Sequence, residues 1–105
     1  MRAALAAALG TRAALVFGDD LGAVAAIRGA PRDSGIVLLV IDGAVGALDR
    51  AMLRAAVAPL ALELAPETRL AALDLTADAE RDAVLAAADY LVSARSTTGQ
   101  VLEIR

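Results

Sequence analysis

Unbroken apolar runs alternate along the chain with longer segments in which apolar residues recur at helical spacing. The clearest run is Ile36–Ile41 (IVLLVI), which ends at Asp42 and Gly43. A run of six β-branched or leucine residues is typical of a strand that is buried on both faces, as in a parallel sheet. We expect three further strands, at Ala13–Phe17, Arg69–Leu75 and Val101–Ile104.

Four segments between these runs predict helices. The first, residues 2–9, is a short helix that ends at Gly10 and not a secretory signal, because Arg12 interrupts the apolar stretch. The longest is Asp49–Ala65, with Asp49 as the expected N-cap. The others are expected around Ala23–Arg28 and at Asp78–Val92, whose first turn is acidic, as suits a helix N-terminus.

Strands and helices therefore alternate along the whole chain. This order predicts an α/β fold, a three-layer α/β/α sandwich around a mostly parallel sheet of about four strands. The 105 residues suit one domain, residues 1–105, with no internal repeat.

The long helix is unusual because only Arg54 and Glu63 are charged between Ala51 and Ala65. An outer helix of a small domain normally has a polar face. Hydrophobic residues also make up 59% of the chain, while a domain of this size buries only about 60–65% of its unfolded surface. We therefore expect part of the apolar excess to face a partner or a second copy of the chain.

The composition lacks the side chains that most enzymes use for catalysis or metal binding. The chain has no histidine, cysteine, lysine or tryptophan, which excludes the common zinc, haem and iron–sulfur sites, histidine bases and Schiff-base lysines. The ten basic residues are all arginines, scattered against thirteen acids. A net charge of −3 without a basic cluster argues against nucleic acid or an anionic membrane as partner, and the uncharged runs are too short to span a bilayer.

The last third of the chain resembles the end of a short-chain dehydrogenase/reductase. The stretch Leu60–Leu75 (LALELAPETRLAALDL) is similar to that family's helix ending in ELAP and the strand after it, and Glu80–Ile104 is similar to its final helix and strand. The most specific match is TGQVL at residues 98–102. Upstream, Phe17–Val24 has the spacing of the family's cofactor loop TGxxxGxG, and Ile36–Ala44 resembles the strand that carries NNAG. The resemblance implies a Rossmann-like fold.

The departures from that family concern its active site. The family's catalytic tyrosine is followed four positions later by a lysine, whereas Tyr90, the one tyrosine here, is followed by Ala94 and lies in the wrong helix. The loop keeps Gly18 and Gly22 but has Val24 at the third glycine position, and Asp19 and Asp20 oppose a pyrophosphate. The family is also more than twice as long. We expect a vestigial loop, no cofactor and no enzymatic activity of the chain alone.

The resemblance implies that assembly parts remain, because the family pairs its subunits through the equivalents of the long helix and of the last helix and strand. We therefore expect a non-catalytic, cytoplasmic assembly subunit. Its partner would be a full-length short-chain reductase, of the β-ketoacyl thioester type of fatty-acid or polyketide synthesis by family analogy, or a second copy of itself. The candidate interface residues are Met52, Leu53, Ala56, Val57, Leu60, Leu64, Leu85, Ala88, Leu91, Val101, Leu102 and Ile104.

Other interpretations remain open at this point. The chain could be a small homodimeric ligand-binding or regulatory domain, or a minimal enzyme in which Asp19, Asp20 and Asp42 hold Mg²⁺. Turn and capping roles are favoured for these aspartates. The hydroxyl residues Ser93, Ser96, Thr97 and Thr98 are expected to form a polar loop and not a nucleophile, because no histidine or lysine base is present.

Overall fold

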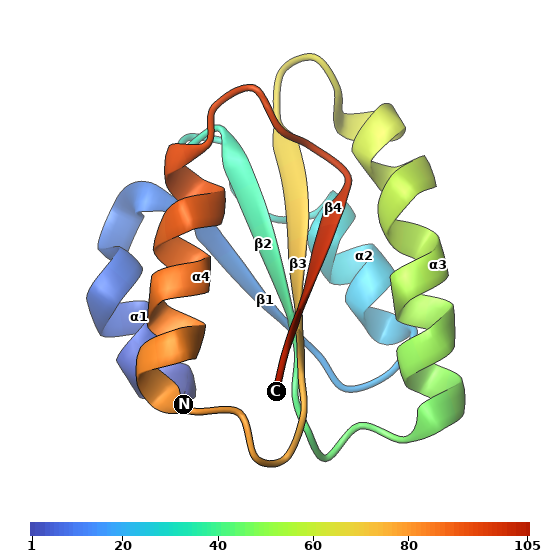
Figure 1. Ribbon diagram of the computed structural model, residues 1–105. Coiled ribbons are helices and arrows are strands. Elements are labelled where there is room, and N and C mark those ends of the chain that lie inside the picture. The colour runs from blue at the N-terminus through green and yellow to red at the C-terminus, as the bar shows by residue number, and fades with distance from the viewer.

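The computed structural model describes all residues, 1–105, and shows a four-stranded sheet between two layers of helices (Figure 1). The strands are β1 (Ala14–Gly18), β2 (Ile36–Ile41), β3 (Arg69–Leu75) and β4 (Gln100–Ile104). The helices are α1 (Arg2–Leu9), α2 (Gly22–Arg28), α3 (Ala47–Leu64) and α4 (Arg81–Ser93), and a 3-10 turn covers Gly10–Arg12. No helix combines the length and the apolar character needed to cross a bilayer.

All strand pairs are parallel and the strand order follows the chain, β1-β2-β3-β4. Leu38 in β2 lies beside Leu15 in β1 and Ala71 in β3. Every residue of β2 is buried, as its unbroken apolar run predicts. The predicted α/β/α sandwich with a parallel sheet of four strands, and its Rossmann-like character, are thus confirmed.

Alternate residues of the strands supply two separate cores. On one face, Ile36, Leu38 and Val40 of β2 pack against α1 and α4. On the other face, Val37, Leu39 and Ile41 pack against α2 and α3. Figure 1 shows this division, with α1 and α4 on one side of the sheet and α2 and α3 on the other.

The last crossover has an unusual hand. The helices α2 and α3 follow β1 and β2 on one face of the sheet, and α4 follows β3 on the opposite face while the strand order continues in the same direction. The β3–α4–β4 connection is therefore opposite in hand to the two before it. Since those two have the usual right-handed form, this one is left-handed (Figure 1). The change of hand gives each face two covering helices.

Two helix starts differ from the sequence prediction. The N-cap of α3 is Gly46 and not Asp49, which lies in the first turn, so the helix begins two residues earlier than expected. The helix α4 begins at Arg81 with Glu80 as N-cap, so Asp78 lies in the preceding turn and only Asp82 remains in the first helical turn. Pro59 lies inside α3 without ending it.

Candidate functional site

Both carboxylates of the glycine loop between β1 and α2 are bonded within the chain. The backbone N–H of Gly22 donates to Oδ1 of Asp20 across 2.7 Å. Asp19 pairs with Arg2, whose Nη2 lies 3.2 Å from Asp19 Oδ1. A pyrophosphate needs free N–H groups and positive potential at this point, and the loop presents a satisfied N–H beside two carboxylates. The residues present do not fit a dinucleotide.

Gly18 and Gly22 have packing and turn roles. A Cβ on Gly18 would lie 3.0 Å from side-chain atoms of Leu39 and Leu53, so glycine allows the close approach of α3 to the sheet. A Cβ on Gly22 would lie 2.8 Å from Asp20 Oδ1, which ties this glycine to the Asp20 turn. The structure therefore explains both glycines without a ligand.

The three aspartates considered for a metal do not gather. Asp42 accepts a hydrogen bond of 3.3 Å from the backbone N–H of Ala44, and Asp19 and Asp20 have the partners given above. The structure contains no group of three or more acidic, histidine or cysteine side chains suited to a metal ion. Asp20 and Asp42 fill the turn roles that the sequence favours.

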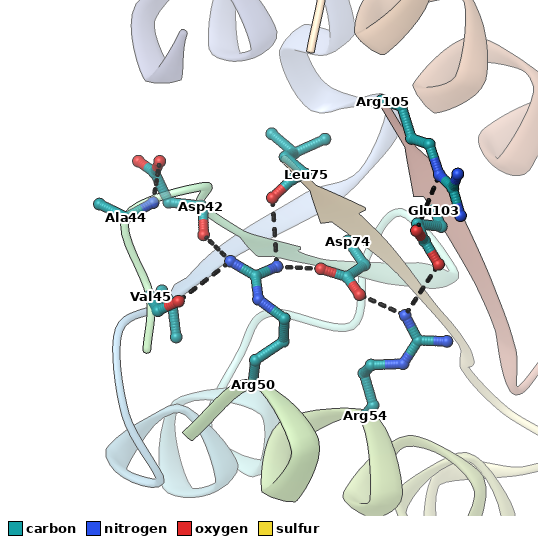
Figure 2. A network of polar contacts seen from close by, with 9 residues as sticks. All are labelled: Asp42, Ala44, Val45, Arg50, Arg54, Asp74, Leu75, Glu103 and Arg105. Atoms are coloured by element: carbon teal, nitrogen blue, oxygen red, sulfur yellow. Dashed lines mark hydrogen bonds and ion pairs between the residues drawn. The ribbon is translucent and has the colours of Figure 1, made fainter. Parts of the chain in front are cut away.

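The most developed polar site lies at the carboxyl ends of β2, β3 and β4 (Figure 2). Its centre is Asp74 of β3, whose side chain is 5% exposed and accepts hydrogen bonds from both Arg50 and Arg54 of α3. Arg50 also donates to the backbone carbonyls of Asp42, Val45 and Leu75, at 2.7, 3.2 and 3.1 Å. Arg50 thus joins α3 to the loops after β2 and β3.

The second arginine connects the site to the edge strand. Arg54 Nη1 lies 3.7 Å from Oε2 of Glu103 in β4, and Glu103 also binds Arg105 (Figure 2). Arg50, Arg54, Asp74 and Glu103 line an open pocket of about 570 Å³, together with Gly43 and Thr76 among others. Two arginines facing two carboxylates leave this pocket without net charge, and no histidine, cysteine or lysine is available as base or nucleophile. The network fixes α3 onto the sheet.

The TGQ match at the start of β4 also has a structural role. Thr98 Oγ1 accepts a hydrogen bond of 3.0 Å from the backbone N–H of Leu70, and the N–H of Gly99 donates to Leu70 O across 2.7 Å. Gly99 has a φ of +76°, which favours glycine. The motif aligns β4 with β3. Of the four hydroxyl residues expected in a polar loop, Ser93 is instead the last residue of α4, and Ser96, Thr97 and Thr98 lie in the loop that follows. Thr97 donates to the backbone carbonyl of Ala94.

Most of the candidate interface residues lie in or against the chain's own core, which corrects the sequence interpretation. Six are buried in the monomer, namely Leu53, Val57, Leu60, Leu64, Ala88 and Leu91. Five more are half-buried against the two cores, namely Ala56, Leu85, Val101, Leu102 and Ile104. Only Met52 is exposed, at 41%. A helix that is apolar all round gives no signal of which side faces inward, so the inner face was mistaken for a contact surface.

The outer face of α3 is nevertheless apolar. The exposed residues Leu48, Ala51, Met52, Ala55, Ala58, Pro59 and Leu62 are all uncharged, and we name this set the α3 stripe. Leu48 and Leu62 are 73% and 80% exposed. The charged side chains of α3 flank the stripe, where Arg50 and Arg54 bind Asp74 and Glu63 binds Arg28. The lack of a polar face on this helix, expected from the sequence, is therefore real, but the residues on its outer face are those of the α3 stripe and not most of the predicted interface residues.

The ion pair between α2 and α3 shifts the acidity of both partners. Arg28 Nε lies 2.9 Å from Oε2 of Glu63. The hydrogen bond from Arg28 lowers the pKa of Glu63 below its ordinary value, and the same bond raises the pKa of Arg28. The pair holds Glu63 ionised at the edge of the α3 stripe.

The tyrosine and the arginines complete the polar inventory. Tyr90 lies on α4, 54% exposed, on the opposite face of the sheet from the Gly18–Gly22 loop. Three arginines that the sequence shows as scattered, Arg12, Arg69 and Arg95, line one pocket at the amino end of the sheet. Only the fold brings these residues together, so no sequence signal indicates them.

Comparison with models of known protein families identifies a match over nearly the whole chain. The family model described as SDR-like, short chain dehydrogenase-like protein, matches residues 1–104. No curated protein and no solved structure matches the chain.

Proposed function

Since residues 1–104 match the family model, the chain belongs to the short chain dehydrogenase-like family, and we propose that it is a non-catalytic assembly subunit that binds a full-length short-chain reductase. In this role it stabilises the oligomer of an active enzyme in the cytoplasm, and the reductase supplies cofactor and catalytic residues. The observation that carries the proposal is the α3 stripe, an exposed helix face without a charged residue.

The absence of a usable active site supports the non-catalytic part. Asp20 occupies the Gly22 N–H, and the chain has no lysine to pair with Tyr90. Family analogy extends the proposal to a partner that reduces β-ketoacyl thioesters. A partner of this family would present an apolar helix of its own, which makes it a match for the α3 stripe.

The energetics of the stripe support a docking role. Leu48 and Leu62 are each largely exposed, and full burial of a leucine contributes about 1.5–3 kcal/mol relative to exposure. Burying both, together with Met52 and the alanines between them, would supply the apolar centre that stable interfaces have. Arg50 and Arg54 are already bound to Asp74, so docking on the stripe would not strip these charges of their partner.

A second copy of the chain is the second candidate partner, favoured by the symmetry of the stripe. Leu48 and Leu62 each lie seven residues from Ala55, and Met52 and Ala58 each lie three residues from it. An antiparallel pair of α3 helices centred on Ala55 would therefore place Leu48 of one copy beside Leu62 of the other. Such self-complementarity is what a two-fold interface requires, and alanine at the centre allows close approach.

The test is native mass spectrometry of the tagged chain purified from its own cells, followed by reconstitution with the protein recovered. We expect a fixed-ratio complex with a chain that carries an intact cofactor loop and a Tyr-x-x-x-Lys pair. Leu62→Glu should abolish the complex without unfolding the chain, because Leu62 is 80% exposed.

The matched control is Ala86→Glu on the exposed face of α4, which should leave the complex intact. If a species of twice the 10.6 kDa chain mass is observed and Leu62→Glu removes it, the partner is a second copy of the chain and not a reductase. A monomer from native extract, or a complex indifferent to Leu62→Glu, would remove the assembly role of the stripe.

A further inference from the structure

An arginine-lined pocket lies at the amino ends of β2 and β3, at the opposite end of the sheet from Asp74. It is open, has a volume of about 650 Å³, and gathers Arg12, Arg69 and Arg95 with the hydroxyls of Ser34 and Ser93. Val92 is the only hydrophobic residue of its lining, and no carboxylate lines it. The chain as a whole has a net charge of −3, whereas the lining of this pocket is positively charged and rich in hydroxyl groups.

Two of the arginines have donors to spare. Arg12 uses only Nη2, which donates to Oδ1 of Asp89 at 2.8 Å and to Oγ of Ser93 at 3.2 Å. Arg95 makes no hydrogen bond or ion pair within the chain. Ser93 accepts from Arg12, so its own hydroxyl proton is free to donate. A bound acceptor could therefore receive hydrogen bonds from Arg12 Nε and Nη1, the guanidinium of Arg95 and the hydroxyl of Ser93.

Arg69 forms the inner wall of the pocket. It donates to the carbonyls of Leu91, Val92 and Ala94 at 3.3, 3.0 and 2.7 Å, and so caps the end of α4. Burial lowers the pKa of Arg69, and the nearby charge of Arg95 lowers it further. The two guanidinium groups thus repel each other with no carboxylate between them. A bound anion would offset this repulsion.

We propose that this pocket binds a small phosphate monoester. Three guanidinium groups against the single carboxylate of Asp89 leave a charge of +2, which matches the charge of about −1.5 to −2 on a phosphate monoester at neutral pH. Guanidinium groups also suit phosphate because they donate in pairs. The lining has no aromatic residue to stack on a base, so the organic part of the ligand is small and polar. The site is independent of the α3 stripe.

The experiment measures thermal unfolding of the full chain in inorganic phosphate and in glycerol phosphate, against chloride at the same ionic strength. A ligand that binds the folded state raises the Tm as its concentration rises. We expect such a rise with both probes, and NMR amide shifts at Ser34, Ser93 and Arg95. Arg95→Gln should weaken the apparent affinity at least about tenfold, as loss of a charge-assisted contact does.

Arg81→Gln is the matched control, because Arg81 is an exposed arginine of α4 without a partner in the chain. It should bind phosphate as the unmodified chain does. Equal loss in both variants, no rise beyond chloride, or amide shifts at Gly22 instead of Ser93 would each overturn the proposal. Binding of inorganic phosphate without glycerol phosphate would overturn the monoester assignment.

Discussion

The carboxylate of Asp20 accepts a hydrogen bond of 2.7 Å from the backbone N–H of Gly22, at the start of α2. In dinucleotide-binding proteins the equivalent helix N-terminus offers its N–H groups to a pyrophosphate. Here an internal anion takes the place of the ligand. In this member of the short chain dehydrogenase-like family, the Gly22 N–H is therefore bonded within the chain.

The first prediction concerns nicotinamide cofactors. We expect NADH and NADPH to leave the Tm of the chain unchanged, because Asp19 and Asp20 oppose a pyrophosphate and Gly22 has no free N–H. The measurement is thermal unfolding over a range of cofactor concentrations. A rise in Tm that grows with concentration would show that the loop retains its function.

The second prediction concerns Asp74. Asp74→Asn leaves Arg50 and Arg54 without their shared carboxylate, and Arg50 is largely buried. We expect the free energy of unfolding to fall by about 3 kcal/mol, the scale for breaking a buried ion pair, measured by urea unfolding. Glu103→Gln is the control, since Glu103 is 43% exposed and 3.7 Å from Arg54, and should cost less than about 1 kcal/mol. Equal effects would mean that Asp74 does not anchor α3.

The third prediction concerns the contact between the loops after β2 and β3. A Cβ on Gly43 would lie 2.6 Å from the backbone nitrogen of Ala77, so Gly43→Ala must push the two loops apart. We expect a loss of about 1–3 kcal/mol in urea unfolding, as for overpacking. Gly46→Ala, with nothing within 4 Å of the added methyl group, should change stability by less than about 1 kcal/mol. A tolerated Gly43→Ala would contradict the close approach of the loops.

The fourth prediction is a pH dependence at the α2–α3 ion pair. The pKa of Glu63 is lowered in the folded chain, so the pair stabilises the fold above the ordinary glutamate pKa. That contribution is lost as the pH falls through the lowered value. Arg28→Gln should raise the pKa of Glu63 toward its ordinary value, followed by NMR titration of the side-chain carboxyl.

Arg32→Gln provides the comparison for this titration. Arg32 acts on Glu63 only through its charge, as the smallest of the influences on that pKa, so its removal should raise the pKa less than Arg28→Gln does. The reverse order would assign the shift to long-range charge and not to the Arg28 hydrogen bond.

The local sequence pattern was sufficient to predict the helices and strands, but not to predict which side chains lie on the surface. The run Ile36–Ile41 predicted β2 to the residue, because six consecutive β-branched or leucine residues between Gly35 and Gly43 are typical of a strand buried on both faces. Asp49 was the wrong N-cap because nothing in the sequence stops Ala47 and Leu48 from joining the helix before it. In both cases the information was local, and only the second was ambiguous.

Tertiary arrangement explains what the sequence analysis missed. The alanine-rich segment of α3 hides the difference between Leu53, which is fully buried, and Leu62, which is exposed, since both are leucines in an uncharged background. Arg12, Arg69 and Arg95 come from three distant segments and meet only once α4 has packed beside α1 and β3. The Arg50–Asp74 pair likewise joins residues 24 positions apart. The periodicity of the sequence does not indicate contacts between residues so far apart.

The parallel topology of the sheet also has a kinetic consequence. Ala14 pairs with Val37, Ile36 with Arg69 and Ala71 with Gln100, so paired strands are 23, 33 and 29 residues apart in sequence. No hairpin is available to nucleate the sheet. The chain therefore loses the entropy of closing each long loop before the contacts between paired strands can stabilise it. Folding should therefore be slow for so small a protein, and the β2–β3 pair, which requires the longest loop, is the entropically most expensive step of its assembly.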